Sequence, residues 1–389
     1  MSVTAARGFV AAGGSAGIKA GGLPDIAVVA TEGAVPAAAA AVFTSNRAAA
    51  APVQVSRAHL EVSGGRASAV VLTSGNANAA TGRGGMAAAR RLCELVGLGV
   101  GVPLQQVLVC QTGLIGVPFP IGVVEPAVGP VVAALDGGEQ AAAAAAAAIM
   151  TTDTVRKEVV VAGGGFTVGG MAKGAAMLAP DMATMLAVLT TDARCDAVLL
   201  RRVLREAVAG TFNRMTVDGA TSTNDTVVLL ASGRAGPVGT EALAEAVAEA
   251  CGSLTAQMVA DAEGATKVVR VRVTGARSEG EAHRAARKVA DSLLVKCSLN
   301  GEDPYWGRVV SELGSAGVEF DLERVAVSYG GIAVCVGGEG MEHDRGAVAT
   351  HMAGRHVEIL GDLGLGDGSA AVLATDLGHG YIDENRTTS

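Results

Sequence analysis

Short valine-rich runs alternate with longer alanine- or leucine-rich segments along the chain, and this alternation restricts the fold more than any other feature. Ala69–Thr73 is an apolar run that ends in Ser-Gly-Asn, which is typical of a buried strand followed by a turn. Gly84–Leu98 repeats apolar residues three or four positions apart, as one face of a helix does. Gln106–Cys110 indicates another buried strand. Gly138–Met150, with eight consecutive alanines, indicates a closely packed helix. The pattern predicts a mixed α/β or α+β protein.

The second half of the chain continues in the same style without repeating the sequence. Helices are expected at Cys195–Thr211, Thr240–Ala260 and Glu279–Leu294, and strands at Thr226–Ala231, at Lys267–Thr274, where valine alternates with charge, and as a pair within Val325–Val336. Before the midpoint, a hairpin that turns at Gly163–Gly165 is expected within Lys157–Val168. A chain of 389 residues suggests two domains or one large two-lobed unit.

Charge and hydropathy exclude several classes of partner. The chain has 30 lysines and arginines against 38 aspartates and glutamates, and we find no polybasic run. Nucleic acid and anionic membranes are therefore poor candidates, and 3% aromatic residues argue against a platform for stacking bases. No uninterrupted apolar run reaches about 18 residues, so we expect no transmembrane helix. Residues 1–30 lack a basic cap followed by a long apolar core, so we expect no secretory signal.

The cysteines and histidines do not suggest a metal site. The six cysteines are far apart and lack CxxC spacing, so we expect buried thiols in a reducing cytosol rather than zinc ligands or disulfides. The histidines lie in charged or turn-like contexts, and none stands in an HExxH motif. We predict a cytoplasmic protein that needs no metal or cofactor.

Thr184 is the candidate nucleophile. It lies in an otherwise apolar block, Gly170–Asp192, which also holds Lys173 and the loop residues Pro180 and Asp181. One interpretation is a buried threonine bonded to a backbone carbonyl. The other is a reactive threonine, whose hydroxyl needs a base to take its proton. Cleavage between Ala183 and Thr184 would supply that base as the new α-amine, whose pKa is about 8.

Three further segments carry polar groups that could serve a reaction. Gln111–Gly116 is a strand that ends in Thr-Gly and can aim a hydroxyl and a backbone N–H into one pocket, as an oxyanion hole requires, although a tight turn also explains it. Ile149–Thr154 clusters hydroxyl groups that could equally cap a helix. In Asp261–Lys267, Glu263 could pair with a cationic ligand or stand in a solvated turn.

Taken together, these segments resemble the ornithine acetyltransferase (glutamate N-acetyltransferase) family of arginine biosynthesis over nearly the whole chain. Eight motifs follow one another in the family's order, which makes the resemblance specific. They lie at the opening (Gly8–Ala20 with Val42–Arg47) and at Ser74–Ala79, Gln111–Gly116, Met150–Glu158, Lys173–Ala193, Ser222–Thr226, Asp261–Lys267 and Glu302–Arg308.

The resemblance implies a reaction and a division of the chain. The precursor would cleave itself between Ala183 and Thr184 into an α chain (1–183) and a β chain (184–389). Thr184 would then accept the acetyl group of N-acetylornithine and pass it to glutamate. The implied fold has two α/β lobes with sheets layered against helices, of the self-cleaving N-terminal-nucleophile type. The implied assembly is α2β2, with small-molecule substrates and no cofactor.

The resemblance also assigns residues. Thr112 and Gly113 would form the oxyanion hole. The substrate would be held by Thr152 (or its neighbour Thr151), Lys173, Thr184, Glu263, Asn385 and Ser389. The chain end, Asn385–Ser389, departs from the family's pattern, so Thr388 is the alternative to Ser389.

Several alternatives stay open at this stage. Acetyl-CoA could serve as an additional donor. The same chemistry could belong to a related acyltransferase of a secondary-metabolite pathway, or to a self-processing amidohydrolase or aminopeptidase in which water takes the acyl group. An unprocessed binding protein is the non-enzyme alternative.

Overall fold

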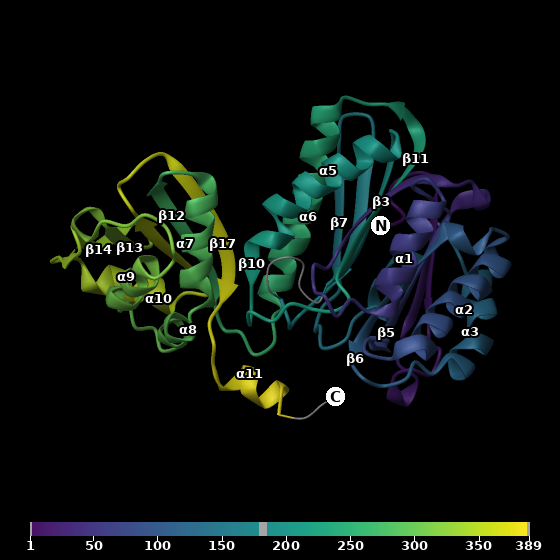
Figure 1. The fold of residues 1–389 in the computed structure, drawn as a ribbon, viewed down its shortest axis with the longest axis horizontal. Coiled ribbons are helices and arrows are strands. Elements are labelled where there is room, and N and C mark those ends of the chain that lie inside the picture. Colours follow the sequence, from purple (N-terminus) through teal and green to yellow (C-terminus); the bar gives the residue numbers. More distant parts are fainter. Residues whose placement is uncertain (1, 179–184, 387–389) are drawn as a thin grey trace. The chain divides into compact units, whose positions relative to one another are not determined.

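The protein is described by a computed structural model that covers residues 2–178 and 185–386. It divides into two compact units (Figure 1). The first contains the described parts of 1–213 and 220–258, and the second contains 214–219 and the described part of 259–388. The two-lobed α/β architecture expected from the sequence is confirmed. The boundary between the units does not follow the predicted 183/184 cleavage point, because the strands on either side of that point belong to the first unit.

One sheet of the first unit has the strand order β1-β2-β5-β6. Its strands are β1 (Phe9–Gly14), β2 (Ile26–Thr31), β5 (Ala69–Asn76) and β6 (Val107–Leu114). The β5 and β6 strands run parallel, whereas the other neighbours are antiparallel. All six residues of β2 are buried, as expected for a strand covered on both faces.

The other sheet of the first unit has the order β4-β3-β11-β9-β8-β7. Its strands are β3 (Ala37–Phe43), β4 (Arg66–Ala67), β7 (Lys157–Ala162), β8 (Thr167–Lys173), β9 (Leu186–Arg194) and β11 (Thr226–Pro237). The hairpin predicted within Lys157–Val168 is confirmed as the antiparallel pair β7 and β8. The alanines of β3 are in a strand because β3 pairs with β11. In this pairing Ala40 lies opposite Leu229.

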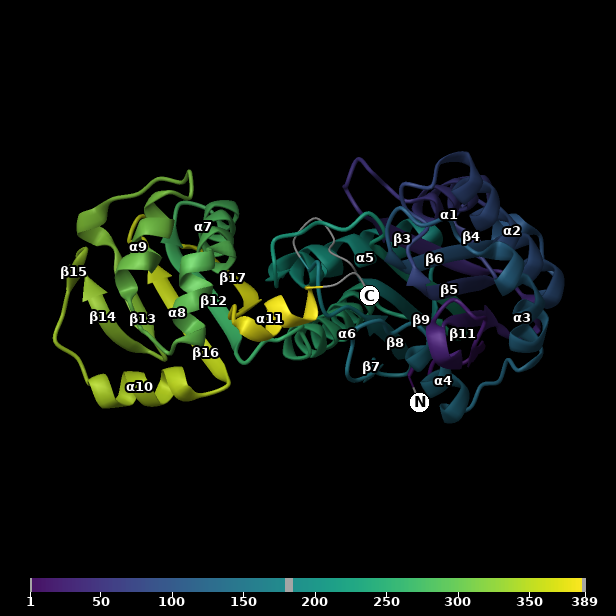
Figure 2. The ribbon, with the colours of Figure 1, turned by 90° about the horizontal axis from the view of Figure 1, so that it is seen from below.

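These two sheets face each other across a shared apolar core. The core joins residues of both sheets, among them Val29 and Leu72 of the first and Val188 and Leu230 of the second. Helices α1 (Ala51–Val62), α2 (Gly82–Val100) and α3 (Ile121–Ala133) lie on the outer side of the first sheet. Helices α5 (Ala197–Gly210) and α6 (Thr240–Ala260) lie on the outer side of the second, so the unit is a helix–sheet–sheet–helix sandwich (Figures 1 and 2).

The alanine-rich segment forms α4 (Glu139–Ala148) and packs against β1, as its small side chains predict. The approach is so close that a Cβ atom on Gly13 of β1 would lie 2.1 Å from the carbonyl oxygen of Ala144. Helix α4 ends immediately before the hydroxyl-rich segment at 150–154. Its docking on β1 therefore helps to fix where that segment begins.

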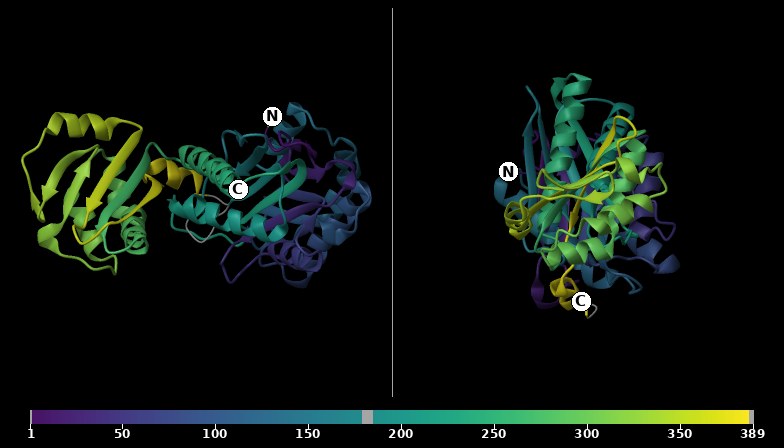
Figure 3. Two further views of the ribbon diagram at one scale, coloured as in Figure 1. Left: turned by 90° about the horizontal axis from the view of Figure 1, so that it is seen from above. Right: turned by 90° about the vertical axis from the view of Figure 1, so that its left-hand side faces the viewer.

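The second unit is built on a sheet of order β10-β17-β12-β16-β13-β14-β15 (Figure 3). Its strands are β10 (Met215–Thr216), β12 (Val268–Ala276), β13 (Ala326–Tyr329), β14 (Ile332–Val336), β15 (Glu339–Gly340), β16 (His356–Asp362) and β17 (Gly368–Thr375). Its helices are α7 (Glu279–Asp291), α8 (Leu293–Asn300), α9 (Trp306–Gly314), α10 (Arg345–Ala353) and α11 (His379–Glu384). In β12, valines face the core and Arg270 and Arg272 face solvent, which confirms the predicted alternation.

Several expectations need correction. The single helix predicted for Glu279–Leu294 is two helices, because the Ser292 hydroxyl caps α8 by accepting a hydrogen bond from the Val295 amide. The cysteines are not all buried: Cys297 is exposed and Cys195 is half-buried. Among the described residues, no helix has the length and apolar character needed to cross a membrane.

Candidate active site

The predicted oxyanion hole lies at the end of β6. Thr112 is buried and is in register with Ser74 of β5, and Gly113 is in register with Gly75. Gly113 has a φ of 126°, and a Cβ atom there would lie 2.2 Å from the carbonyl carbon of Gly75. Only glycine fits this backbone conformation and this approach. The strand end thus presents a threonine hydroxyl followed by an irreplaceable glycine.

Lys173 reaches this hydroxyl from the other sheet. It is the last residue of β8, and its side chain is buried. Its Nζ donates a hydrogen bond to Thr151 Oγ1 at 2.6 Å and lies 3.4 Å from Thr112 Oγ1. Three segments that the sequence singled out separately therefore meet at one ammonium group. Thr151, rather than the exposed Thr152, makes the contact with Lys173.

A buried carboxylate, Asp153, supports the same lysine. Its Oδ1 accepts hydrogen bonds from Lys157 Nζ at 2.6 Å and from the Gly174 amide at 2.8 Å, and its Oδ2 accepts one from the Thr151 amide at 3.0 Å. The Nζ of Lys173 lies 3.9 Å from Oδ2. Burial raises the pKa of Asp153, but the charges of Lys173 and Lys157 and these hydrogen bonds outweigh burial and lower it to about 2. The group is therefore ionised at neutral pH.

A second lysine, Lys19, approaches from the loop between β1 and β2. A Cβ atom on Gly75 would lie 3.1 Å from its Cγ, so its stem crosses β5 beside the oxyanion-hole strand. Its Nζ donates to the carbonyl oxygen of Met150 at 2.6 Å. Burial lowers the pKa of Lys19, and the positive charge of Lys173 lowers it further. The carboxylate of Asp25 shapes the loop by accepting the amides of Ala16, Ile18 and Lys19.

The motif Ser222–Thr226 joins the site to the start of β9. Asp225 is fully buried, and its Oδ1 accepts a hydrogen bond from the Met185 amide at 2.8 Å. Burial raises the pKa of Asp225 well above its usual range. The side-chain amide of Asn224 donates to the carbonyl oxygens of Ala77 and Gln111. These bonds hold both sheets together next to Thr112.

Three predicted site residues, Ala183, Thr184 and Ser389, lie outside the described residues. The described residue that follows Thr184 is Met185. It is buried immediately before β9, and its amide donates a hydrogen bond to Asp225.

Two predicted substrate-binding residues meet in the second unit. The side-chain amide of Asn385 donates to Glu263 Oε2 at 2.8 Å. Gly264 lies against helix α11, since a Cβ atom there would be 2.1 Å from the Tyr381 amide nitrogen. The Tyr381 hydroxyl in turn contacts Asp218 Oδ2 at 3.2 Å. The chain end is thereby anchored beside Glu263.

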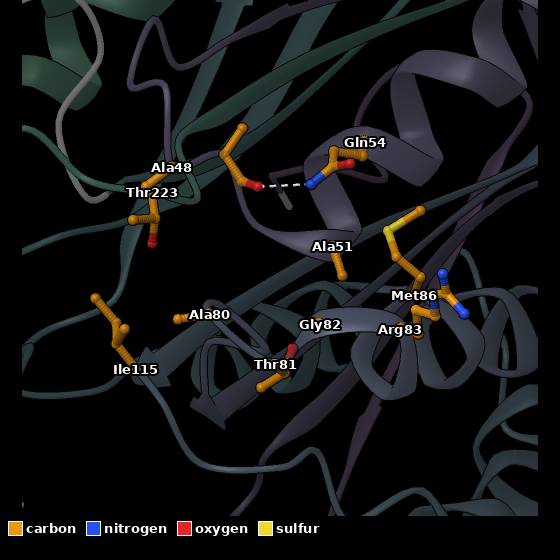
Figure 4. Close-up of a pocket in the computed structure, with 11 residues that line it drawn as sticks. Ala48, Ala51, Gln54, Ala80, Thr81, Gly82, Arg83, Met86, Ile115 and Thr223 are labelled. Carbon is orange, nitrogen blue, oxygen red and sulfur yellow. Dashed lines mark hydrogen bonds between the residues drawn. The ribbon is translucent and has the colours of Figure 1, made fainter.

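A cavity of about 520 Å³ lies in the first unit, close to the strand that carries Thr112 (Figure 4). Ile115, Ala80 and Thr223 line one side, and Gln54, Arg83 and Met86 line the other. Within the described residues, none of the predicted site residues lines this cavity. The chemistry is concentrated instead in the buried cluster around Lys173. The described residues contain no group of three or more histidine, cysteine, aspartate or glutamate side chains that could hold a metal ion.

Comparison with known proteins places the chain in a family. The model of the ArgJ family matches residues 10–387 of the chain. The chain belongs to the ArgJ family.

Curated ArgJ proteins resemble the chain over its full length. It is 48% identical over 396 residues to the arginine biosynthesis bifunctional protein ArgJ of Mycobacterium tuberculosis (strain H37Rv), covering 100% of this chain and 96% of that protein. It is 47% identical over 396 residues to the protein of the same name from Streptomyces coelicolor, covering 100% of both.

Solved ArgJ structures are also similar to the chain. The ArgJ structure from Bacillus halodurans is 34% identical, with a TM-score of 0.49, and covers 51% of this chain and 96% of that chain. The Mycobacterium tuberculosis ornithine acetyltransferase complexed with ornithine is 45% identical, with a TM-score of 0.44, and covers 46% of this chain and 94% of that chain.

Sequence reasoning missed four charged residues of this ArgJ-family site: Lys19, Asp153, Lys157 and Asp225. Each of them stood inside a quoted motif, but charged residues in such positions usually face solvent. Only the tertiary fold shows that Asp153 and Lys157 are buried against each other. The available signal was the placement of Asp153 between two hydroxyl residues, four positions before a lysine.

Proposed function

We propose that this ArgJ-family enzyme transfers an acetyl group from N2-acetyl-L-ornithine to L-glutamate in arginine biosynthesis, after cleaving itself between Ala183 and Thr184. One structural observation carries the proposal. Lys173, Thr112 and Thr151, which lie on separate segments, converge at hydrogen-bond distances beside Gly113, a position of strand β6 that requires glycine. The bifunctional ArgJ relatives, which match the chain from end to end, support the same reaction.

The first half-reaction loads the enzyme. The α-amine released at Thr184 takes the proton of its own hydroxyl, and the hydroxyl oxygen attacks the acetyl carbonyl carbon of acetylornithine. The negative charge that develops on the carbonyl oxygen is stabilised by the Thr112 hydroxyl and the Gly113 amide. Because Lys173 donates to the Thr112 oxygen, the hydroxyl hydrogen of Thr112 can point at that charge. The C–N bond then breaks, ornithine leaves with the proton, and the acetyl ester of Thr184 remains.

The second half-reaction transfers the acetyl group from Thr184 to glutamate. The neutral amine of glutamate attacks the ester carbonyl, and the same two donors stabilise the oxyanion. The ester bond breaks, the Thr184 oxygen regains a proton, and N-acetylglutamate departs. No group outside the chain and its two substrates is consumed.

The residues that hold substrate are matched to its charges. The ammonium group of Lys173 suits an α-carboxylate, and the carboxylate of Glu263, steadied by Asn385, suits the side-chain ammonium of ornithine. Thr151 or Thr152 and Ser389 add polar contacts. The proposal includes an α chain (1–183) and a β chain (184–389) in an α2β2 assembly in the cytoplasm, with acetyl-CoA as an additional donor in keeping with the bifunctional relatives.

An assay that distinguishes acetyl transfer to glutamate from acetyl transfer to water tests the function. Purified protein is incubated with acetylornithine in the presence and absence of glutamate, and ornithine, N-acetylglutamate and acetate are quantified. The proposal predicts that N-acetylglutamate matches ornithine mole for mole, and that Thr184→Ala produces neither. Release of acetate that does not depend on glutamate would contradict transfer and indicate an amidohydrolase.

A further inference from the structure

A buried ion pair lies directly behind the lysine that we place at the substrate. Asp153 and Lys157 have fully buried side chains and are joined at 2.6 Å. The same carboxylate faces Lys173, but at 3.9 Å. Two ammonium groups thus face one buried carboxylate. The nearer one belongs to Lys157, to which the proposed function assigns no role.

The geometry divides the tasks between the two lysines. Asp153 Oδ1 is occupied by Lys157 and by the Gly174 amide, and Oδ2 by the Thr151 amide. Lys173 instead makes its 2.6 Å contact with the Thr151 hydroxyl and faces the hydroxyl of Thr112. A short ion pair between Lys173 and Asp153 would draw its charge away from those hydroxyls and toward the protein's own carboxylate.

We propose that Lys157 is a positioning residue: by engaging Asp153, it keeps the Lys173 ammonium on Thr112 and Thr151, where it binds the substrate carboxylate. The inference rests on the proposed function, in which Lys173 meets that carboxylate. The substrate's carboxylate and Asp153 compete for the Lys173 ammonium group. Because Lys157 pairs with Asp153, Lys173 stays available to the substrate.

Lys157→Met tests this directly. Without the nearer ammonium group, Lys173 becomes the ion-pair partner of Asp153 in a region of low dielectric constant. We expect KM for acetylornithine and for glutamate to rise about tenfold or more, because ground-state binding of the carboxylate is lost, and kcat to fall as well, because Thr112 loses the donor that orients its hydroxyl. A crystal structure of the variant should show the Lys173 Nζ closer to Asp153 Oδ2 than 3.9 Å and withdrawn from Thr151.

A double variant separates positioning from simple loss of structure. In Lys157→Met with Asp153→Asn, the competing charge is absent, and the single amide oxygen accepts one of the two backbone N–H groups, of Gly174 and Thr151, that the two carboxylate oxygens accept in the wild type. We expect KM to return to within about threefold of the wild-type value, which makes the double variant better than the single one. A purely structural role predicts that the second substitution adds to the damage.

Lys296→Met is the matched control, because Lys296 is another buried lysine, which donates to the Thr375 carbonyl oxygen in the second unit. It should alter the melting temperature without raising KM. If Lys157→Met does not fold, Lys157→Gln carries the same test, since it removes the charge and keeps a hydrogen-bond donor.

The inference is overturned if Lys157→Met or Lys157→Gln leaves KM unchanged, or if the double variant shows no recovery. These outcomes differ from failure of the proposed function, in which the wild-type protein itself forms no N-acetylglutamate.

Discussion

At the scale of single residues, the candidate site combines two buried carboxyl groups whose pKa values are shifted in opposite directions. The charges of Lys173 and Lys157 lower the pKa of Asp153, whereas burial raises the pKa of Asp225. The Asp225 carboxyl, whose pKa burial shifts toward the uncharged form, accepts the Met185 amide beside the proposed oxyanion hole. The two carboxyls therefore serve opposite electrostatic needs.

The raised pKa of Asp225 makes stability depend on pH. The folded protein keeps a proton that the unfolded chain releases above about pH 4, so this residue destabilises the fold progressively as pH rises toward the folded-state pKa. Asp225→Asn keeps the acceptor for Met185 and abolishes the ionisation. We expect the variant to melt at a higher temperature than wild type at pH 8, with the difference shrinking toward pH 4. Calorimetry at both pH values checks this, and a difference that grows toward pH 4 would contradict a neutral Asp225.

At the scale of elements, the oxyanion hole depends on how closely β5 and β6 approach. Gly113→Ala places a Cβ atom 2.2 Å from the Gly75 carbonyl carbon at a φ of 126°, so the strand end must move. We expect kcat to fall about 100-fold or more, as when one oxyanion-hole donor is removed.

Gly116→Ala is the control for that substitution. Gly116 has a φ of 83°, but a Cβ atom there meets no atom within 4 Å. It should cost about 1 kcal/mol of stability from backbone strain and leave kcat nearly unchanged. Equal kcat losses in the two variants would show that backbone strain, and not the β5–β6 contact, governs the rate.

Sequence patterns predicted elements well where local preference and tertiary environment agree. Helix α6 spans the predicted Thr240–Ala260, and the hairpin of β7 and β8 turns where glycines indicated it. They predicted no element where the environment decides the structure. Ala37–Phe43 is alanine-rich, which locally favours a helix, yet pairing with β11 makes it a strand. Helix α3 contains Pro126 and Pro130, which hide a helix in a sequence pattern.

At the scale of the whole molecule, motif order could identify the site but not its electrostatics. Thr112 and Lys173 lie 61 residues apart in the sequence, and the fold brings Lys173 Nζ to 3.4 Å from Thr112 Oγ1. The supporting charges could not be foreseen, because burial of Asp153 and Lys157 depends on how the two sheets pack. The pairing of Glu263 with Asn385 likewise depends on the packing of helix α11 beside Gly264.

The central claim is that Thr184 becomes a chain end and so gains the amine that activates it. Intact-mass measurement with N-terminal sequencing of the purified protein tests this most directly. We predict two fragments, one of which begins at Thr184, and a Thr184→Ala variant that stays whole. A single chain of 38.4 kDa in the wild-type protein, under conditions in which acetyl transfer is assayed, would contradict the account.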